Sequence, residues 1–164
     1  MSLVTLADQT VLRCRAHVPS YGVGWYDVEL DDEIELSGAV TLALPGLDLA
    51  GTIMSGGPWK GRSRYRVAAG AGQWGKAVGA RSYANDAGVK VSKVLGEVAT
   101  EIGETLSTTS TADAGSYYVR EAGPAGRQMS LLAPRAWYVD ETGITRLGAR
   151  TASTYDGDGT VVKL

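Results

Sequence analysis

Hydrophobic and polar residues alternate along the first seventy positions, in short runs separated by glycine and proline. In the clearest run, residues 24–30, apolar side chains occupy every second position, and Trp25 and two acids occupy the others. A period of two places alternate side chains on opposite faces of a strand. Such runs predict strands at residues 11–18, 24–30, 38–44, 47–54 and 63–69. Short strands with turn signals between them favour a small β-barrel, because closure removes exposed sheet edges.

The pattern changes in the second half of the chain. Apolar residues recur every three or four positions up to Leu106, which predicts an amphipathic helix over about 89–106 with Asp86 placed to cap it. The residues that follow predict a strand at 117–120, a short helix at 124–132 that opens with proline, and a hairpin within 136–148.

The expected fold is therefore α+β and β-rich. A small N-terminal β-barrel spans residues 1–75, and an α+β lobe spans residues 76–164 with a short sheet over 116–148. The final stretch, YDGDGTVVKL, is expected to form a turn and a last strand.

The amino-acid composition narrows the class of protein further. The chain has 164 residues, 44% apolar and 21% charged, which is typical of a folded globular protein. Its single cysteine, Cys14, has no partner for an internal disulfide and reads as a small core residue. The N-terminus lacks a secretion signal, and no apolar run approaches about 18 residues, so we expect a soluble protein made in the cytoplasm.

Charge is segregated along the sequence. Six acids and no base lie between Asp27 and Glu35, whereas six bases and no acid lie between Leu49 and Asn85. Complementary patches suit contacts between copies of one subunit, but they also suit pairing of two neighbouring strands within the chain. Both interpretations stay open at this stage. The predicted interface residues are Asp27, Glu29, Asp31, Arg62, Arg64, Arg66, Trp59 and Trp74.

Motifs with catalytic or cofactor chemistry are weak. The GAGQWG segment matches the glycine spacing of a dinucleotide fingerprint, but the helix that should begin inside it starts about 15 residues too late, so a connecting turn is favoured. His17 is the only histidine and has no nucleophile motif beside it. The DGDG string at 156–159 lacks the later glutamate of a calcium loop. We therefore expect no catalytic residue, no cofactor and no metal.

Two rival functions follow from the charged strands. The predicted strand with Arg62, Arg64 and Arg66 on one face, near tryptophans and tyrosines, would suit a small-barrel module for single-stranded nucleic acid or saccharide. The acids of residues 27–35 could instead supply the carboxylate pair of a cell-wall hydrolase. An overall slight excess of acid argues against nucleic acid, and the acids fall mainly on the polar face of one strand and its turn, which argues against a hydrolytic pocket.

Two stretches resemble a known family. In the segment from LDLAGTIMSGG to GEVATEIGETL, a strand-rich region runs through a glycine-rich connection into a Tyr-x-x-Asp-Ala-Gly-Val turn at Tyr83–Val89 and then an amphipathic helix. Downstream, SYYVREAGPAG opens a short helix with Gly-Pro-Ala, and a Trp-x-Val-Asp-x-x-Gly hairpin follows at Trp137–Gly143. From about residue 10 to 150, this arrangement resembles bacteriophage tail-hub and baseplate-hub proteins.

The resemblance implies a structural protein of the virion tail. Proteins of this family form rings, commonly trimers, at the tail tip and join the tail tube to the spike or fibre apparatus. The implied partners are tube, spike, fibre or adaptor proteins and further copies of the chain itself. No membrane partner is expected, and the slight excess of acid disfavours nucleic acid. The hydrolase of the rival interpretation would then be tail-associated, and the chain would be made in the host cytoplasm. The chain is short for the family, which leaves open a full hub, a minor tail-tip subunit or a small adaptor.

Overall fold

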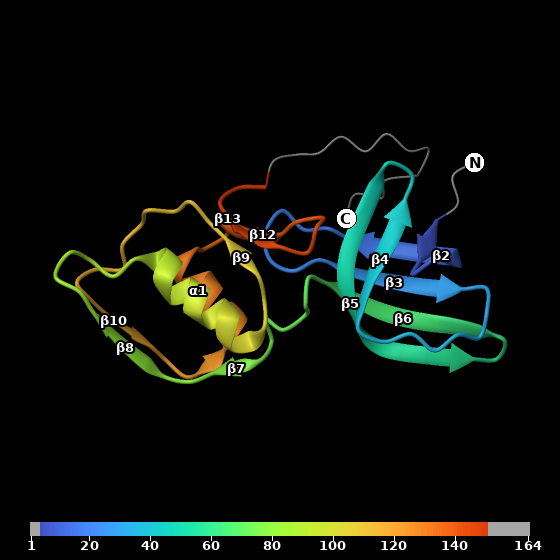
Figure 1. The fold of residues 1–164 in the computed structure, drawn as a ribbon, viewed down its shortest axis with the longest axis horizontal. Helices are drawn as coiled ribbons and strands as arrows, with labels where there is room; N and C mark the ends of the chain where they lie inside the picture. Colours follow the sequence, from blue (N-terminus) through green and yellow to red (C-terminus); the bar gives the residue numbers. More distant parts are fainter. Residues whose placement is uncertain (1–3, 151–164) are drawn as a thin grey trace.

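The computed structural model describes residues 4–150. Its N-terminal part is a closed six-stranded barrel in which the strands follow the order β1-β2-β3-β6-β5-β4 (Figure 1). Every neighbouring pair in the barrel is antiparallel. The strands are β1 (Thr5–Leu6), β2 (Gln9–His17), β3 (Trp25–Leu30), β4 (Ala39–Leu44), β5 (Leu47–Trp59) and β6 (Arg62–Ala69).

The barrel forms because its strands keep the alternation seen in the sequence. In β3 and β6 every second residue is buried, and the inward side chains include Tyr26, Leu30 and Val67. The charged residues of the same strands point outward. This separation gives the barrel an apolar interior and a charged outer wall.

The predicted barrel strands are all present, with two differences. The two-residue strand β1 was missed, because two residues carry no readable period, yet β1 pairs with both β2 and β4 and so closes the barrel. β5 continues to Trp59, beyond the predicted end of this strand at residue 54. An irregular register after Ile53 lets this strand bend and continue its pairing with β6.

The C-terminal part is an α+β lobe beside the barrel (Figure 1). Its small sheets contain two or three strands each. Its elements are β7 (Ala77–Val78), β8 (Arg81–Ala84), α1 (Val91–Ile102), β9 (Leu106–Ser107), β10 (Tyr117–Arg120), β11 (Gly123–Pro124), α2 (Ala125–Leu132), β12 (Trp137–Val139) and β13 (Thr145–Leu147).

Helix α1 is shorter at both ends than the predicted helix. The expected cap at Asp86 is wrong: the N-cap is Lys90, with no side-chain hydrogen bond, and the residues before it form a turn. At the other end Gly103 adopts a left-handed conformation with φ 81°, which ends the helix. Leu106 therefore lies in β9, where it pairs with Thr145 of β13.

A hairpin late in the sequence fastens the lobe to the barrel. Gly22, between β2 and β3, exchanges backbone hydrogen bonds with the β12 strand, donating to Trp137 at 2.8 Å and accepting from Val139 at 3.2 Å. Ala50 of β5 donates to the carbonyl of Glu141 at 2.8 Å. One apolar cluster runs from the barrel interior to α1, so the two parts share a core.

The structure confirms the predicted fold class, a β-rich α+β fold with a small barrel and one long amphipathic helix. The predicted DGDG turn and final strand lie outside the described residues. Within residues 4–150, neither helix is long and apolar enough to cross a bilayer.

Candidate assembly surface

Charged side chains form two rows across the outer wall of the barrel. In one row, Arg15, Asp27 and Arg66 are register partners on β2, β3 and β6. In the next row, Glu29 of β3 lies between Arg13 and Arg64. Opposite charges directly across neighbouring strands stabilise the pairing modestly.

Three ion pairs join β3 to β6. The carboxylate of Asp27 accepts hydrogen bonds from Nε and Nη2 of Arg66, both at 2.7 Å. Glu29 accepts from Nη1 of Arg62 at 2.8 Å and lies 3.4 Å from Nε of Arg64. Of the two interpretations of the segregated charge, pairing between neighbouring strands is thus present within the chain.

These contacts hold both carboxylates in the charged form. The hydrogen bond from Arg66 lowers the pKa of Asp27, although partial burial acts against it. The hydrogen bond from Arg62 likewise lowers the pKa of Glu29. A general acid needs the opposite shift, toward a raised pKa.

Two tryptophans lie among the cations of this wall. The guanidinium of Arg66 lies 4.9 Å from the ring centroid of Trp25, and the ammonium of Lys60 lies 4.8 Å from that of Trp59. Trp59 is 54% exposed. Cations stacked on an exposed indole ring, as at Trp59, make a surface suited to desolvated contact with a partner. We call this surface the basic face; it consists of Arg13, Arg15, Lys60, Arg62, Arg64, Arg66, Trp25 and Trp59.

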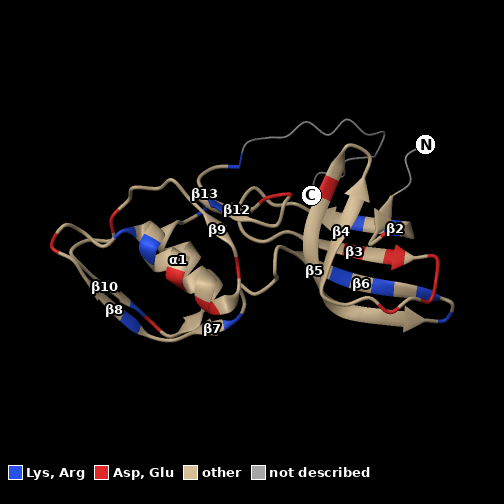
Figure 2. Ribbon diagram, in the orientation of Figure 1, with Lys and Arg blue, Asp and Glu red and all other residues tan. Residues whose placement is uncertain are grey.

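The remaining acids of the cluster lie after β3. Figure 2 shows the red acidic segments of this loop at the end of the barrel away from α1, and the blue arginine bands along β6. All four acids are exposed. We call this segment the acidic loop; its charged residues are Asp31, Asp32, Glu33 and Glu35.

Buried hydroxyl groups hold the backbone of the acidic loop. Ser63, which is fully buried, accepts from the N–H of Ile34 at 2.7 Å and lies 2.9 Å from the carbonyl oxygen of Asp32. The Tyr65 hydroxyl accepts from the N–H of Leu36 at 2.9 Å and donates to the Ile34 carbonyl. The loop therefore lies fixed across the barrel end, tied by inward-facing residues of β6.

The predicted interface residues do not all share one surface. Asp27, Glu29, Arg62, Arg64, Arg66 and Trp59 come together on the outer wall, while Asp31 lies in the acidic loop. Trp74 corrects the prediction: it is 4% exposed, its ring packs against Trp137, and its indole N–H donates to Thr145 at 3.0 Å. It belongs to the interior because the glycine-rich connection turns inward there.

Four members of the basic face were not among the predicted interface residues, namely Arg13, Arg15, Trp25 and Lys60. The two arginines lie two positions apart in a predicted strand, so their shared face was readable from the period. The sequence did not predict which residues lie beside these arginines in the sheet, because the register depends on which strands pair.

The GAGQWG segment is a connecting turn, as predicted, and the structure shows what fills its concave side. Glu104, just after α1, accepts from the backbone N–H of Gln73 at 2.6 Å and of Ala71 at 3.3 Å. Burial raises the pKa of Glu104, and these two hydrogen bonds act in the opposite direction. Backbone donors that would hold a phosphate in a nucleotide site are thus bound to a carboxylate of the same chain.

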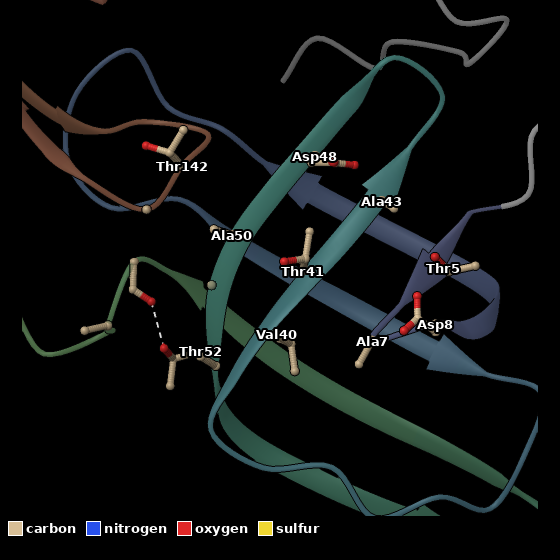
Figure 3. Close-up of a pocket in the computed structure, with 15 residues that line it drawn as sticks. Thr5, Ala7, Asp8, Val40, Thr41, Ala43, Asp48, Ala50, Thr52 and Thr142 are labelled. Atoms are coloured by element: carbon tan, nitrogen blue, oxygen red, sulfur yellow. Dashed lines mark hydrogen bonds between the residues drawn. The ribbon is translucent and has the colours of Figure 1, made fainter.

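A shallow groove lies between the barrel wall and the hairpin turn (Figure 3). It has a volume of about 710 Å³ and is lined by β4, β5 and the Thr142–Gly143 turn. Its side chains are small, and Thr52 donates to the carbonyl of Gly70 at 2.8 Å. Among the described residues, the acids in its lining are Asp8 and Asp48, and no aromatic residue lines it.

Two further residues with potentially reactive side chains, His17 and Cys14, lie in strand β2 of the barrel wall. His17 is exposed and stacks on Trp25, with ring centroids 5.6 Å apart. Cys14 is half-buried against the core, where burial raises the pKa of its thiol to about 11. In residues 4–150 no group of three or more potential metal-ligating side chains comes together.

The fold has a counterpart among solved structures of viral tail proteins. It is similar to the crystal structure of the prophage MuSo2 43 kDa tail protein from Shewanella oneidensis, with a TM-score of 0.62 and 12% sequence identity. The match covers 90% of this chain and 54% of that protein, so this chain spans about half the length of its neighbour. At this identity the likeness concerns the fold. Neither a protein family nor a curated protein matches the sequence.

Proposed function

We propose that this chain is a structural component of a bacteriophage tail, in a tail-hub, baseplate or tail-tip position. There it assembles with further copies of itself into a ring and joins the tail tube to the spike or fibre apparatus. Its place of action is the virion tail, and its partners are tube, spike, fibre or adaptor proteins. The observation that carries the proposal is the fold likeness to a prophage tail protein over 90% of the chain.

The sequence patterns that resemble hub proteins support the same proposal, because they occupy joints of the fold. Tyr83–Val89 forms the connection from β8 to α1, and Trp137–Gly143 forms the hairpin that bonds to the barrel. Within the second pattern, Trp137 and Val139 are buried and Asp140 organises the turn.

We further propose that the chain catalyses no reaction. The acids of β3 have lowered pKa values and arginine partners, an environment opposite to that of a glycosidase acid. Glu104 has a raised pKa, but both of its oxygens accept backbone hydrogen bonds. These arrangements favour a structural role over wall hydrolysis.

The test is the composition of the particles. Tailed particles purified from a strain that carries the encoding phage are analysed by quantitative mass spectrometry, and a deletion of the gene is compared with a complemented strain. We expect the particles to contain the chain in a fixed ratio to the tube subunit. Particles from the deletion strain should have tails that lack a complete tip. Particles that lack the chain, with a deletion that leaves tails and infectivity unchanged, would contradict the proposal.

A further inference from the structure

The two charged surfaces of the barrel are unequally neutralised within the chain. Asp27 and Glu29 are bound by arginines of β6. Among residues 4–150, none of the four acids of the acidic loop makes an ion pair. The loop therefore presents four uncompensated negative charges at the barrel end.

The basic face has the matching excess. It contains six cations, and only two acids, Asp27 and Glu29, lie among them, which leaves a surplus of four positive charges. Even the arginines that pair with these acids keep side-chain exposures of 54%, 60% and 55%. Arg13, Arg15 and Lys60 have no ion-pair partner in the described part of the chain.

We propose that the acidic loop of one copy docks on the basic face of the next copy. The loop caps the barrel end and the basic face covers its side, so the contact joins two different surfaces in a head-to-tail arrangement. Such contacts generate a closed ring when the rotation between copies allows it. This inference rests on the proposed ring assembly and assigns its contact surfaces.

The structure supplies the features that such a contact needs. The backbone of the loop is already fixed by Ser63 and Tyr65, so little conformational entropy is lost on docking. Trp59, 54% exposed and flanked by cations, offers apolar area within the charged contact. Asp27 and Glu29 already form ion pairs with arginines of the same chain. In this arrangement they orient the arginine side chains of the basic face and do not contact the neighbouring copy.

Charge reversal tests the pairing directly. One variant reverses the loop (Asp31→Lys, Asp32→Lys, Glu33→Lys), and another reverses the unpaired cations of the face (Arg13→Glu, Arg15→Glu, Lys60→Glu). Self-association is measured by sedimentation velocity at 50 mM and 500 mM NaCl, and incorporation into particles is measured by mass spectrometry. We expect each variant alone to associate at least about 100-fold more weakly, because like charges then meet across the contact.

Complementation distinguishes this contact from simple loss of fold or charge. In an equimolar mixture the two variants should associate with each other again, because both the original and the reversed contact form between unlike copies. Strict alternation closes only a ring with an even number of copies, so in an odd-numbered ring the mixture restores pairwise association without closure. A single chain that carries both reversals should also assemble and enter particles. As a matched control, Lys76→Glu, Lys93→Glu and Arg135→Glu reverse three exposed cations of the lobe, and we expect assembly to be unchanged.

The outcomes separate this inference from the proposed function. If the chain is a particle component but both reversed variants are incorporated normally, the inference is overturned and the tail role stands. If neither mixing nor the doubly reversed chain restores assembly, the loop and face are not partners. The inference also fails if only the face variant is defective and its lost property is salt-dependent binding of single-stranded DNA, since the face then serves nucleic acid. Absence of the chain from particles contradicts the tail role. The docking of loop on face is then tested only by the sedimentation experiment, in which the mixed variants should associate and each variant alone should not.

Discussion

The barrel and the α+β lobe use charged residues in different ways. On the barrel, paired charges lie on the outer wall, where Arg62, Arg64 and Arg66 stay more than half exposed. The lobe also has exposed ion pairs, but three of its charged side chains are buried at joints: Arg120 is 3% exposed, and Asp140 and Glu104 are 9% and 6% exposed.

The difference shows which charges hold the fold and which are available to a partner. The barrel is held by a closed ladder of backbone hydrogen bonds around an apolar interior, so its outer charges add little to stability. The lobe has strands of two to four residues, too short to hold themselves together, and buried polar groups join them. Substitutions at the two kinds of site should therefore separate stability from assembly.

The largest expected effect is at Asp140. Its carboxylate accepts from the N–H groups of Thr142 and Ile144, from the Thr142 hydroxyl and from Nε of Arg146, at 2.7–3.0 Å. Asp140→Ala leaves these donors without their acceptor, and we expect the free energy of unfolding to fall by about 3 kcal/mol. Urea denaturation measures the change. A loss no greater than that of an exposed control, Glu121→Ala, would show that the turn does not depend on this carboxylate.

A smaller loss is expected at Glu104. Glu104→Ala removes the acceptor for the N–H groups of Ala71 and Gln73 in the connection between barrel and lobe, at a cost of about 2 kcal/mol. Hydrogen exchange should show faster exchange of these two amides, while the β3–β6 amides of the barrel exchange as in the wild type. Equal acceleration in both regions would show that the connection does not open independently.

Acid should weaken the lobe through Asp140. Partial burial opposes ionisation of Asp140, but the hydrogen bonds from Thr142 and Arg146 prevail and lower its pKa. A carboxyl with a lowered pKa stabilises the fold above its ordinary value of about 4, and this stability is lost as the pH falls through the lowered pKa. Glu104, whose pKa is raised, acts with the opposite sign.

Denaturation midpoints at pH 7, 5 and 3 measure this dependence. We expect the wild type to lose stability mainly below pH 4, and Asp140→Asn to lose less over the same interval because its side chain does not titrate. An Asp140→Asn variant with the same acid dependence as the wild type would place the sensitive carboxylate elsewhere.

The smallest effect on stability is expected at Asp27. Its side chain is 40% exposed, so the pair with Arg66 is screened by water, and Asp27→Asn should change the free energy of unfolding by less than about 1 kcal/mol. Thermal unfolding at low and high salt measures it. A loss as large as that of Asp140→Ala would mean that barrel charges hold the fold as lobe charges do.

Much of this fold could be predicted from local patterns. Strands β3 and β6 keep strict alternation, and α1 keeps its apolar stripe, so their burial follows from the period of the sequence. The charge segregation and the weakness of the nucleotide and histidine motifs were also readable locally. The two-residue strands β1, β7, β9 and β11 were not, because their pairing is decided by partners far away in the chain.

The amino-acid sequence by itself determined which residues of the alternating strands and of α1 face inward, and that opposite charges lie on two segments. The tertiary structure decided which charges meet: it placed Asp27 and Glu29 beside arginines, set the acidic loop apart at the barrel end, and turned Trp74 into the core. The spacing of apolar residues is a property of neighbouring positions in the chain. Strand register and strand order depend instead on contacts between residues that are distant in the chain. The partners of a charged side chain are therefore known only once the barrel has closed.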